Sequence, residues 1–330
     1  MKILLFSRKH MIAITFVILT CIACFMMFHL YPRTVSEKMV MGGTLYAQTT
    51  DEDQTPIKSK SDAQTYFRPS SLPALNNQFT YSFFDPYFEK EPSEIKLPQD
   101  LLKSPKNTIL NYFSVLREAA NVTEDKYSGC GTIGNAKIPY PVAYQFLSSD
   151  YQQRLPYDQY LKSFQNILHT SLIKYKVAPI YNNPSDSLRY FVEIETIQGS
   201  KSGLSNFVYY YAFIDLIKED GVYKINDINF TGEDFLCAPY HGWSHNAEAS
   251  VQIRYGDWCN MIKKLNPTIQ KDYIKQITFR GTDGKDYLIL FYQLTNNTDI
   301  EIAQYIKGKD GKWLLTKLDP EKCLEKKQQK

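Results

Sequence analysis

Residues 141–168 read PVAYQFLSSDYQQRLPYDQYLKSFQNIL, and this stretch decides the predicted fold. It begins with a short apolar helical turn, passes a polar corner at residues 148–150, and starts a second helix at Pro156. In the second helix, apolar and aromatic residues recur at three- and four-residue steps, so they share one face. They are Tyr157, Tyr160, Leu161, Phe164, Ile167 and Leu168. The pattern predicts a fold and leaves the reaction open.

The segments on either side of this stretch complete an α+β pattern. Upstream, Ser104 and Pro105 are typical of a helix start, with an N-cap hydroxyl followed by proline at the first helical position. Downstream, alternating apolar residues and turn signals predict four strands. The strands are expected at 170–178, 188–197, 206–218 and 222–230. Helices followed by an antiparallel meander predict an α+β domain over residues 104–232.

Three helical motifs in this order resemble a known superfamily. They are YFSVLREA at 112–119, AYQFLS at 143–148 and LPYDQYLKSF at 155–164. With the strands that follow, they resemble the nuclear-transport-factor-2-like superfamily, which includes ketosteroid isomerases. The resemblance implies a curved antiparallel sheet wrapped around helices to form a cone. Many members place a small hairpin between the second and third helices, and this chain has only residues 148–155 there.

A second, smaller α+β domain is predicted over residues 247–323, after a linker at 233–246. Val251, Tyr255, Trp258, Ile262 and Leu265 are spaced as on an amphipathic helix that Pro267 ends. Four strands joined by hairpin turns should follow it, at 273–279, 287–294, 300–306 and 312–318. This plan resembles cystatin-like sheets wrapped on one helix. The charged tail at 324–330 is expected to fray.

The N-terminus predicts a membrane anchor. Residues 11–31, MIAITFVILTCIACFMMFHLY, carry no formal charge and follow a positive segment at 1–10. A run of this length predicts a single-pass transmembrane helix, a signal-anchor with a cytoplasmic N-terminus. The remainder would then lie outside the cell membrane, beyond a stalk at 32–103. A cleaved signal peptide and a lipid-anchored Cys24 are the alternatives.

Four cysteines lie in the part of the chain predicted to be extracytoplasmic. Sequence order favours bridges between Cys130 and Cys237 and between Cys259 and Cys323, with free buried thiols as the alternative. An oxidising exterior compartment permits such disulfides.

One group of residues has the spacing of a metal site. Cys237, His241 and His245 are four residues apart, and on a helix they would share a face that could ligate zinc. Pro239 and Gly242 disfavour a helix there, and a Cys237 disulfide would consume the thiol. The sequence therefore predicts no metal and no other cofactor.

The resemblance also implies where catalysis would occur, since enzymes of the superfamily use Asp, His or Tyr inside the cone. The nearest candidates here are Tyr144, Asp150 and His169. An aspartate base beside a phenolic donor is a proton-shuttling pair. Each residue also has a simple structural role, because Asp150 lies in a polar corner and His169 ends a helix. No phosphate-binding loop or nucleophile elbow is present in the sequence.

Composition and motifs together favour binding over catalysis. The chain is 43% hydrophobic with a formal net charge of +3, which gives no broad surface for nucleic acid. We therefore expect a membrane-anchored, non-catalytic protein-interaction or scaffold module with a protein partner. The alternative is a small-molecule-binding protein, or a lyase- or isomerase-type enzyme, that uses the cone pocket. A filled cone interior would favour the first, and an open cavity with converging polar groups the second.

Overall fold

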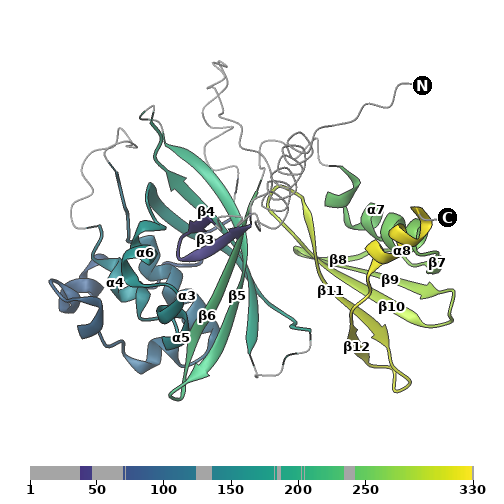
Figure 1. The fold of residues 1–330 in the computed structure, drawn as a ribbon, viewed down its shortest axis with the longest axis horizontal. Helices are drawn as coiled ribbons and strands as arrows, with labels where there is room; N and C mark the ends of the chain where they lie inside the picture. Colours follow the sequence, from purple (N-terminus) through teal and green to yellow (C-terminus); the bar gives the residue numbers. More distant parts are fainter. Residues whose placement is uncertain are drawn as a thin grey trace, which may run out of the picture. The chain divides into compact units, whose positions relative to one another are not determined.

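The structure is a computed structural model, and its described residues are 38–46, 70, 72–123, 136–181, 183, 187–201, 203, 205–233 and 242–328. All of them belong to one compact unit that begins at Lys38. The architecture is mixed α and β, with two six-stranded sheets and few, mostly short helices (Figure 1).

The first sheet has the order β1-β2-β6-β5-β4-β3. Its strands are β1 (Lys38–Val40), β2 (Gly43–Tyr46), β3 (Ile167–Ala178), β4 (Leu188–Gln198), β5 (Asn206–Glu219) and β6 (Val222–Gly232). Neighbours are antiparallel except β2 and β6, which run parallel. The four strands predicted between residues 170 and 230 are all present, because alternating apolar residues and the Asp220–Gly221 turn specify them locally.

Short helices cover the inner face of this sheet. They are α3 (Pro105–Arg117), α4 (Pro139–Tyr144), α5 (Ser149–Arg154) and α6 (Tyr157–Lys162). The Ser104 side chain accepts a hydrogen bond from the Asn107 amide, so α3 starts at the predicted cap. The predicted polar corner is itself helix α5, because the Ser148 side chain caps it by accepting from the Tyr151 amide.

Much of the segment predicted to be a stalk is part of this domain. Strands β1 and β2 extend the sheet, and the 3-10 helices η1 (Tyr81–Tyr87), η2 (Pro92–Glu94) and η3 (Gln99–Leu102) pack on it. Phe84 is fully buried, so η1 is anchored in the core of this domain. A sequence without apolar periodicity can still pack when it is held by a preformed surface.

The second sheet has the order β12-β11-β10-β9-β7, and β8 also pairs with β9. Its strands are β7 (Ile262–Leu265), β8 (Ile269–Lys271), β9 (Ile274–Gly281), β10 (Asp286–Gln293), β11 (Asp299–Lys307) and β12 (Trp313–Thr316). Helix α7 (Ala247–Val251) continues into the π-helical segment η6 (Gln252–Trp258), and α8 (Pro320–Gln328) follows β12. The four predicted hairpin strands are present, and β7, β8 and α8 are additions to the prediction.

The predicted long helix of this domain ends earlier than expected. Its apolar pattern runs to Leu265, but η6 ends at Trp258 and Ile262–Leu265 form strand β7. Asn260 takes a left-handed conformation with φ 51°, and its amide donates to the Gly256 carbonyl oxygen at 2.8 Å. A residue in this conformation terminates a helix. The helical spacing of the last two apolar residues was therefore coincidental.

The predicted transmembrane element of the fold is corrected. Within the described ranges from residue 38 to residue 328, no helix is both long enough and apolar enough to cross a membrane. The run at 11–31 lies outside the described residues. The single-pass, signal-anchor and cell-membrane assignments that depended on it are therefore without support.

Part of the outer face of the first sheet is buried against the second sheet. Phe191 on β4 and Tyr292 on β10 meet edge to face with ring centroids 5.3 Å apart. Tyr292 and Tyr273 donate hydrogen bonds to the Val177 and Tyr175 carbonyl oxygens on β3, at 2.7 and 2.9 Å. The second sheet therefore protects much of the β3 edge, which would otherwise be open to strand pairing.

Candidate functional site

Side chains fill the space between helices α3–α6 and the inner face of the first sheet. The largest of them come from α3, from α4 and α6 or the residues just after them, and from the sheet, and they are buried. They include Ile109, Tyr112, Phe113, Leu116, Tyr140, Phe146, Tyr160, Phe164, Val192, Ile194, Ile214, Leu216, Ile225 and Phe230. The Phe164 ring lies 4.8 Å from that of Tyr140 and 4.9 Å from that of Tyr160, measured between centroids. The site implied by the cone resemblance is therefore packed with side chains.

Two phenols meet in the middle of this interior. The hydroxyl oxygens of Tyr112 and Tyr160 are 3.3 Å apart, and both residues are fully buried. Burial raises the pKa of each phenol well above its ordinary value, because a phenolate would lose its hydration. Both stay neutral at physiological pH. They act as a structural hydrogen-bonded pair, and neither is poised as a base.

The turn of the β1–β2 hairpin packs against this pair. The Met41 amide donates to the Ser163 carbonyl oxygen at 3.1 Å, and the Gly42 amide donates to the Ser163 hydroxyl at 2.7 Å. The Tyr151 hydroxyl donates to the Gly42 carbonyl oxygen at 2.6 Å. A Cβ at Gly42 would lie 2.5 Å from the Tyr160 ring. The hairpin turn thus fits closely against the interior and adds to its filling.

The three predicted catalytic candidates lie on three different elements. The Tyr144 hydroxyl donates to the Leu155 carbonyl oxygen at 2.9 Å, so it ties α4 to the end of α5. Asp150 is on α5 with its side chain 66% exposed, and it pairs with Arg154 at 3.2 Å. His169 is on β3 opposite Ile197, partly exposed. Tyr144 and Asp150 therefore have structural partners, a backbone carbonyl group for the first and an i,i+4 ion pair for the second.

The predicted metal-site residues can be placed only in part. Cys237 and His241 lie outside the described residues, as does Cys130, so the Cys130–Cys237 pairing stays a prediction. His245 is at the end of the 3-10 helix η5 (Trp243–His245). Among the residues that the structure describes, no group of three His, Cys, Asp or Glu side chains could hold a metal ion.

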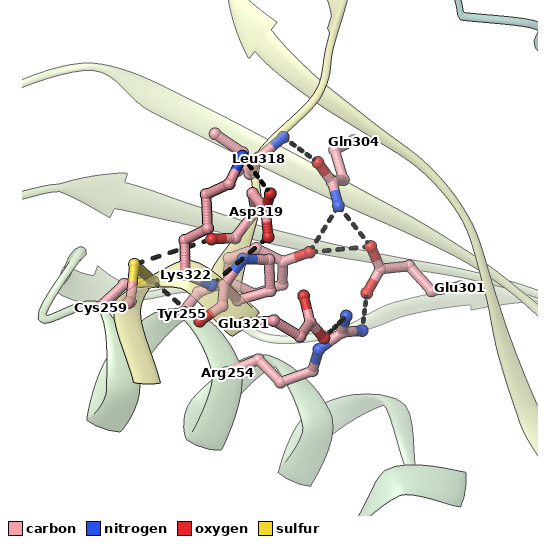
Figure 2. Close-up of polar contacts among 11 residues, drawn as sticks. Arg254, Tyr255, Cys259, Glu301, Gln304, Leu318, Asp319, Glu321 and Lys322 are labelled. Carbon is pink, nitrogen blue, oxygen red and sulfur yellow. Dashed lines mark hydrogen bonds and ion pairs between the residues drawn. A yellow bond between two sulfur atoms is a disulfide. The ribbon is translucent and has the colours of Figure 1, made fainter. Parts of the chain in front are cut away.

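The other predicted cysteine pair forms a disulfide that joins η6 to α8. Cys259 and Cys323 are bonded, and a polar network beside them connects the same elements (Figure 2). Arg254 pairs with Glu301 at 2.8 Å and with Glu321 at 2.6 Å. The Tyr255 hydroxyl donates to Glu301 at 2.8 Å. Two kinds of interaction therefore hold the C-terminal helix against the domain.

A buried ion pair lies where the two sheets meet. The Lys174 ammonium is 2.7 Å from a Glu193 carboxylate oxygen, and their side chains are 7% and 0% exposed. Lys174 also donates to the Gln293 carbonyl oxygen and the Thr295 hydroxyl, at 2.9 and 3.2 Å. The Thr295 amide donates to the other Glu193 oxygen at 2.7 Å. Lys174 and Glu193 lie on the first sheet, and Gln293 and Thr295 lie at the end of β10 in the second domain. The ion pair therefore links the two domains.

A second carboxyl group shares this environment. Both side-chain oxygens of Glu233 are buried and have no hydrogen-bond partner among the described residues. Desolvation raises the pKa of Glu233 well above its ordinary value, the Glu193 charge raises it further, and Lys174 opposes the shift. The protonated acid is therefore favoured. Lys174 is the neighbouring cation of two buried carboxyl groups, Glu193 and Glu233. The charge on one carboxyl group therefore affects the protonation of the other.

An open groove of about 440 Å³ runs beside the ion pair. It is lined by Leu75, Ile173, Lys174, Tyr175, Lys176, Val177, Tyr190 and Tyr273. The Lys106 ammonium lies 5.9 Å from the centroid of the Tyr175 ring, and the Tyr175 and Tyr190 rings stack with centroids 6.5 Å apart. The groove offers aromatic faces and positive charge, with no carboxylate among its lining residues.

Sequence reasoning missed the Lys174–Glu193 pair. The alternation of β3 places Lys174 and Lys176 on one face, and that of β4 places Glu193 and Glu195 beside Phe191. Charges alternating with apolar residues usually indicate a solvated face. Phe191 is the residue that could have revealed the buried pair. A large apolar residue on a charged face indicates that another element covers that face.

The fold and this interior define a class only: a mixed α and β protein with a filled, aromatic interior beneath a curved sheet. Neither a protein-family model nor a curated protein matches the chain. Among solved structures it is similar to an "Ntf2 like protein involved in plasmid conjugation", at 11% identity over 54% of this chain and 92% of that chain. The TM-score is 0.16. At such a TM-score the likeness carries no argument about this chain.

Proposed function

We propose that this chain is a non-catalytic protein-interaction or scaffold module that acts through its surfaces. The observation that carries the proposal is the filled interior of the first domain. Enzymes and small-molecule carriers need a concave, accessible space with convergent polar groups. Here that space holds aromatic rings and the Tyr112–Tyr160 hydroxyl pair. The alternative, a lyase- or isomerase-type enzyme in the cone, would need a base inside it.

The surroundings of the catalytic candidates support the same reading. The Tyr144 hydroxyl donates hydrogen bonds to backbone carbonyl oxygens at Gln152 and Leu155. These bonds hold α4 against α5 and involve no group that would bind a substrate. Asp150 lies near the start of a helix and pairs with Arg154 in solvent. A carboxylate in that position stabilises a helix and is worth about 0.3–1 kcal/mol. A role in stability is therefore sufficient for both residues.

Two substitutions test the proposal. Asp150→Ala should stay folded and should support the same cellular phenotype as the wild-type protein when it replaces that protein in cells that depend on it. Phe164→Ala should cost about 3–5 kcal/mol, because it empties a buried aromatic site, and should abolish function by unfolding the domain. Thermal melting of both purified variants beside the cellular assay separates stability from activity. A folded but inert Asp150→Ala protein would overturn the proposal in favour of an enzyme.

A further inference from the structure

The last strand of the second sheet has an open edge. Strand β12 stands at the end of the strand order and pairs with β11 on one side. The Gly308 amide donates to the Lys312 carbonyl oxygen at 2.8 Å, so these two residues form a hydrogen-bonded pair. Along β12, residues that hydrogen-bond to β11 then alternate with residues that do not. By that alternation the backbone groups of Trp313 and Leu315 are turned away from β11. They can accept a further strand.

Two other edge strands, β3 and β7, differ from β12. The β3 edge is covered at Leu172 by hydrogen bonds with Leu75 and Asn76, and further along by the hydroxyls of the second sheet. Strand β7 carries Lys263 and Lys264 within its four residues, and charges inside an edge strand prevent pairing. Strand β12, WLLT, carries no charge. It lacks the protection that β3 and β7 have.

The first two side chains of β12, Trp313 and Leu314, are exposed although they are apolar. Trp313 is 38% and Leu314 is 51% exposed. An exposed tryptophan is a frequent anchor of protein interfaces. The lysines around the strand are all exposed: Lys307, Lys309, Lys312 and Lys317. The Lys307 ammonium lies 5.7 Å from the centroid of the Trp313 ring. The edge is therefore an apolar strip framed by positive charge, with Asp310 as the acidic group of its turn.

We propose that the β12 edge binds an extended, acidic peptide segment of a partner protein by strand addition. The peptide backbone pairs with Trp313 and Leu315, and its apolar residues contact Trp313 or Leu314. Its carboxylates face the surrounding lysines, which supply charge complementarity and steer the encounter. A second copy of the chain is a poorer occupant, because two lysine-framed edges repel each other. This inference rests on the proposed function and names the chemistry of the partner.

Labelled synthetic peptides test the inference. One ten-residue peptide alternates Glu with Val, a second alternates Lys with Val, and a third has the acidic composition with two central prolines that prevent strand pairing. Fluorescence anisotropy with the full chain should show saturable binding of the first peptide only. Raising the salt concentration from 50 to 500 mM should weaken that binding at least tenfold, because the contact is electrostatic.

Variants of the edge then locate the site. Leu315→Pro removes an outward-facing amide donor while it keeps Trp313 and the lysines, and it should weaken acidic-peptide binding at least tenfold. A Lys312→Glu and Lys317→Glu double variant should do the same through charge. Ile269→Ser, at an exposed apolar position on β8, is the matched control and should bind as the wild type does. Thermal melting verifies that each variant is folded.

Three results would overturn the inference. The first is equal binding of the acidic and basic peptides, and the second is unchanged binding by the folded Leu315→Pro protein. The third is self-association through β12, detected by sedimentation as a dimer that Leu315→Pro dissociates. None of these outcomes alters the result expected for Asp150→Ala, so the proposed function and the partner chemistry fail separately.

Discussion

The Tyr151 hydroxyl donates a 2.6 Å hydrogen bond to the carbonyl oxygen of Gly42, so helix α5 is tied to the turn of the β1–β2 hairpin. Both groups are buried, and the hairpin meets the Tyr112–Tyr160 pair at the same place. This bond joins a segment without apolar periodicity to the interior of the domain.

Replacement of Tyr151 by Phe should therefore destabilise the protein by about 1–2 kcal/mol. The substitution keeps the ring but leaves the Gly42 carbonyl oxygen buried without its donor. Urea unfolding followed by circular dichroism measures the change. Unchanged stability would mean that water replaces the hydroxyl and that the hairpin is held by Ser163 alone.

A side chain at Gly42 should be more disruptive. Gly42 has φ +75° and a Cβ would lie 2.5 Å from the Tyr160 ring, so Gly42→Ala combines backbone strain with overpacking. We expect a loss of about 2–4 kcal/mol. Gly221→Ala is the matched control, because Gly221 has φ +85° but no atom within 4 Å of the added Cβ. It should lose about 1–2 kcal/mol from strain alone. Equal losses would contradict the close fit of the hairpin.

The contributions of Lys174 and Glu193 to the free energy of unfolding should be coupled. Lys174→Met should cost about 3–5 kcal/mol, because it leaves the buried Glu193 carboxylate without its cation. Adding Glu193→Gln should recover part of that loss, since the amide oxygen can still accept from the Thr295 amide. A double-mutant cycle by chemical unfolding measures the coupling. Additive losses would show that the two groups act independently.

Glu233 predicts a pH dependence of stability. Its pKa is raised in the folded protein, so the folded state holds the proton more tightly than the unfolded state. Its contribution is complete below the ordinary glutamate pKa of about 4.5 and is lost as the pH rises through the raised value. Between pH 5 and pH 8 the wild type should lose stability that Glu233→Gln keeps. Glu325→Gln, at an exposed position, should follow the wild type, and parallel curves for all three would refute the assignment.

The Cys259–Cys323 disulfide should matter most at the C-terminus. Cys259→Ser should cost about 2–4 kcal/mol and should expose α8 amides to hydrogen exchange before those of β10. Cys323→Ser should match it, and the double variant should cost no more than either one, because all three remove the same bond. A double variant that loses the sum would indicate that each thiol contributes separately.

The sequence predicts the locally specified parts of the fold well. The Ser104 cap, the Asp220–Gly221 turn and strands β3–β6 depend on residues close together in the chain. The β1–β2 hairpin could not be predicted in this way. Its strands are three and four residues long, and its partner β6 lies far downstream. Only tertiary contacts decide such short segments.

The candidate site shows the same limit. Tyr144, Asp150 and His169 were grouped because the superfamily resemblance implied a pocket, but the interior is filled by residues whose apolar spacing was visible in the sequence. The spacing of apolar residues in the sequence does not show how large aromatic rings pack against one another. The Lys174–Glu193 pair likewise depends on strand register and on a second sheet that covers the first.

The parallel pairing of β2 with β6 has a consequence for synthesis. Thr44 lies opposite Asn229, so the hairpin leaves the ribosome long before its neighbour in the sheet exists. At ordinary translation speeds of about 5–20 residues per second, the wait is roughly 10–40 s. During that interval the nascent hairpin has no sheet to join. Chaperone capture or a translational pause in this window would act on this protein more strongly than on one whose strands pair in the order they are made.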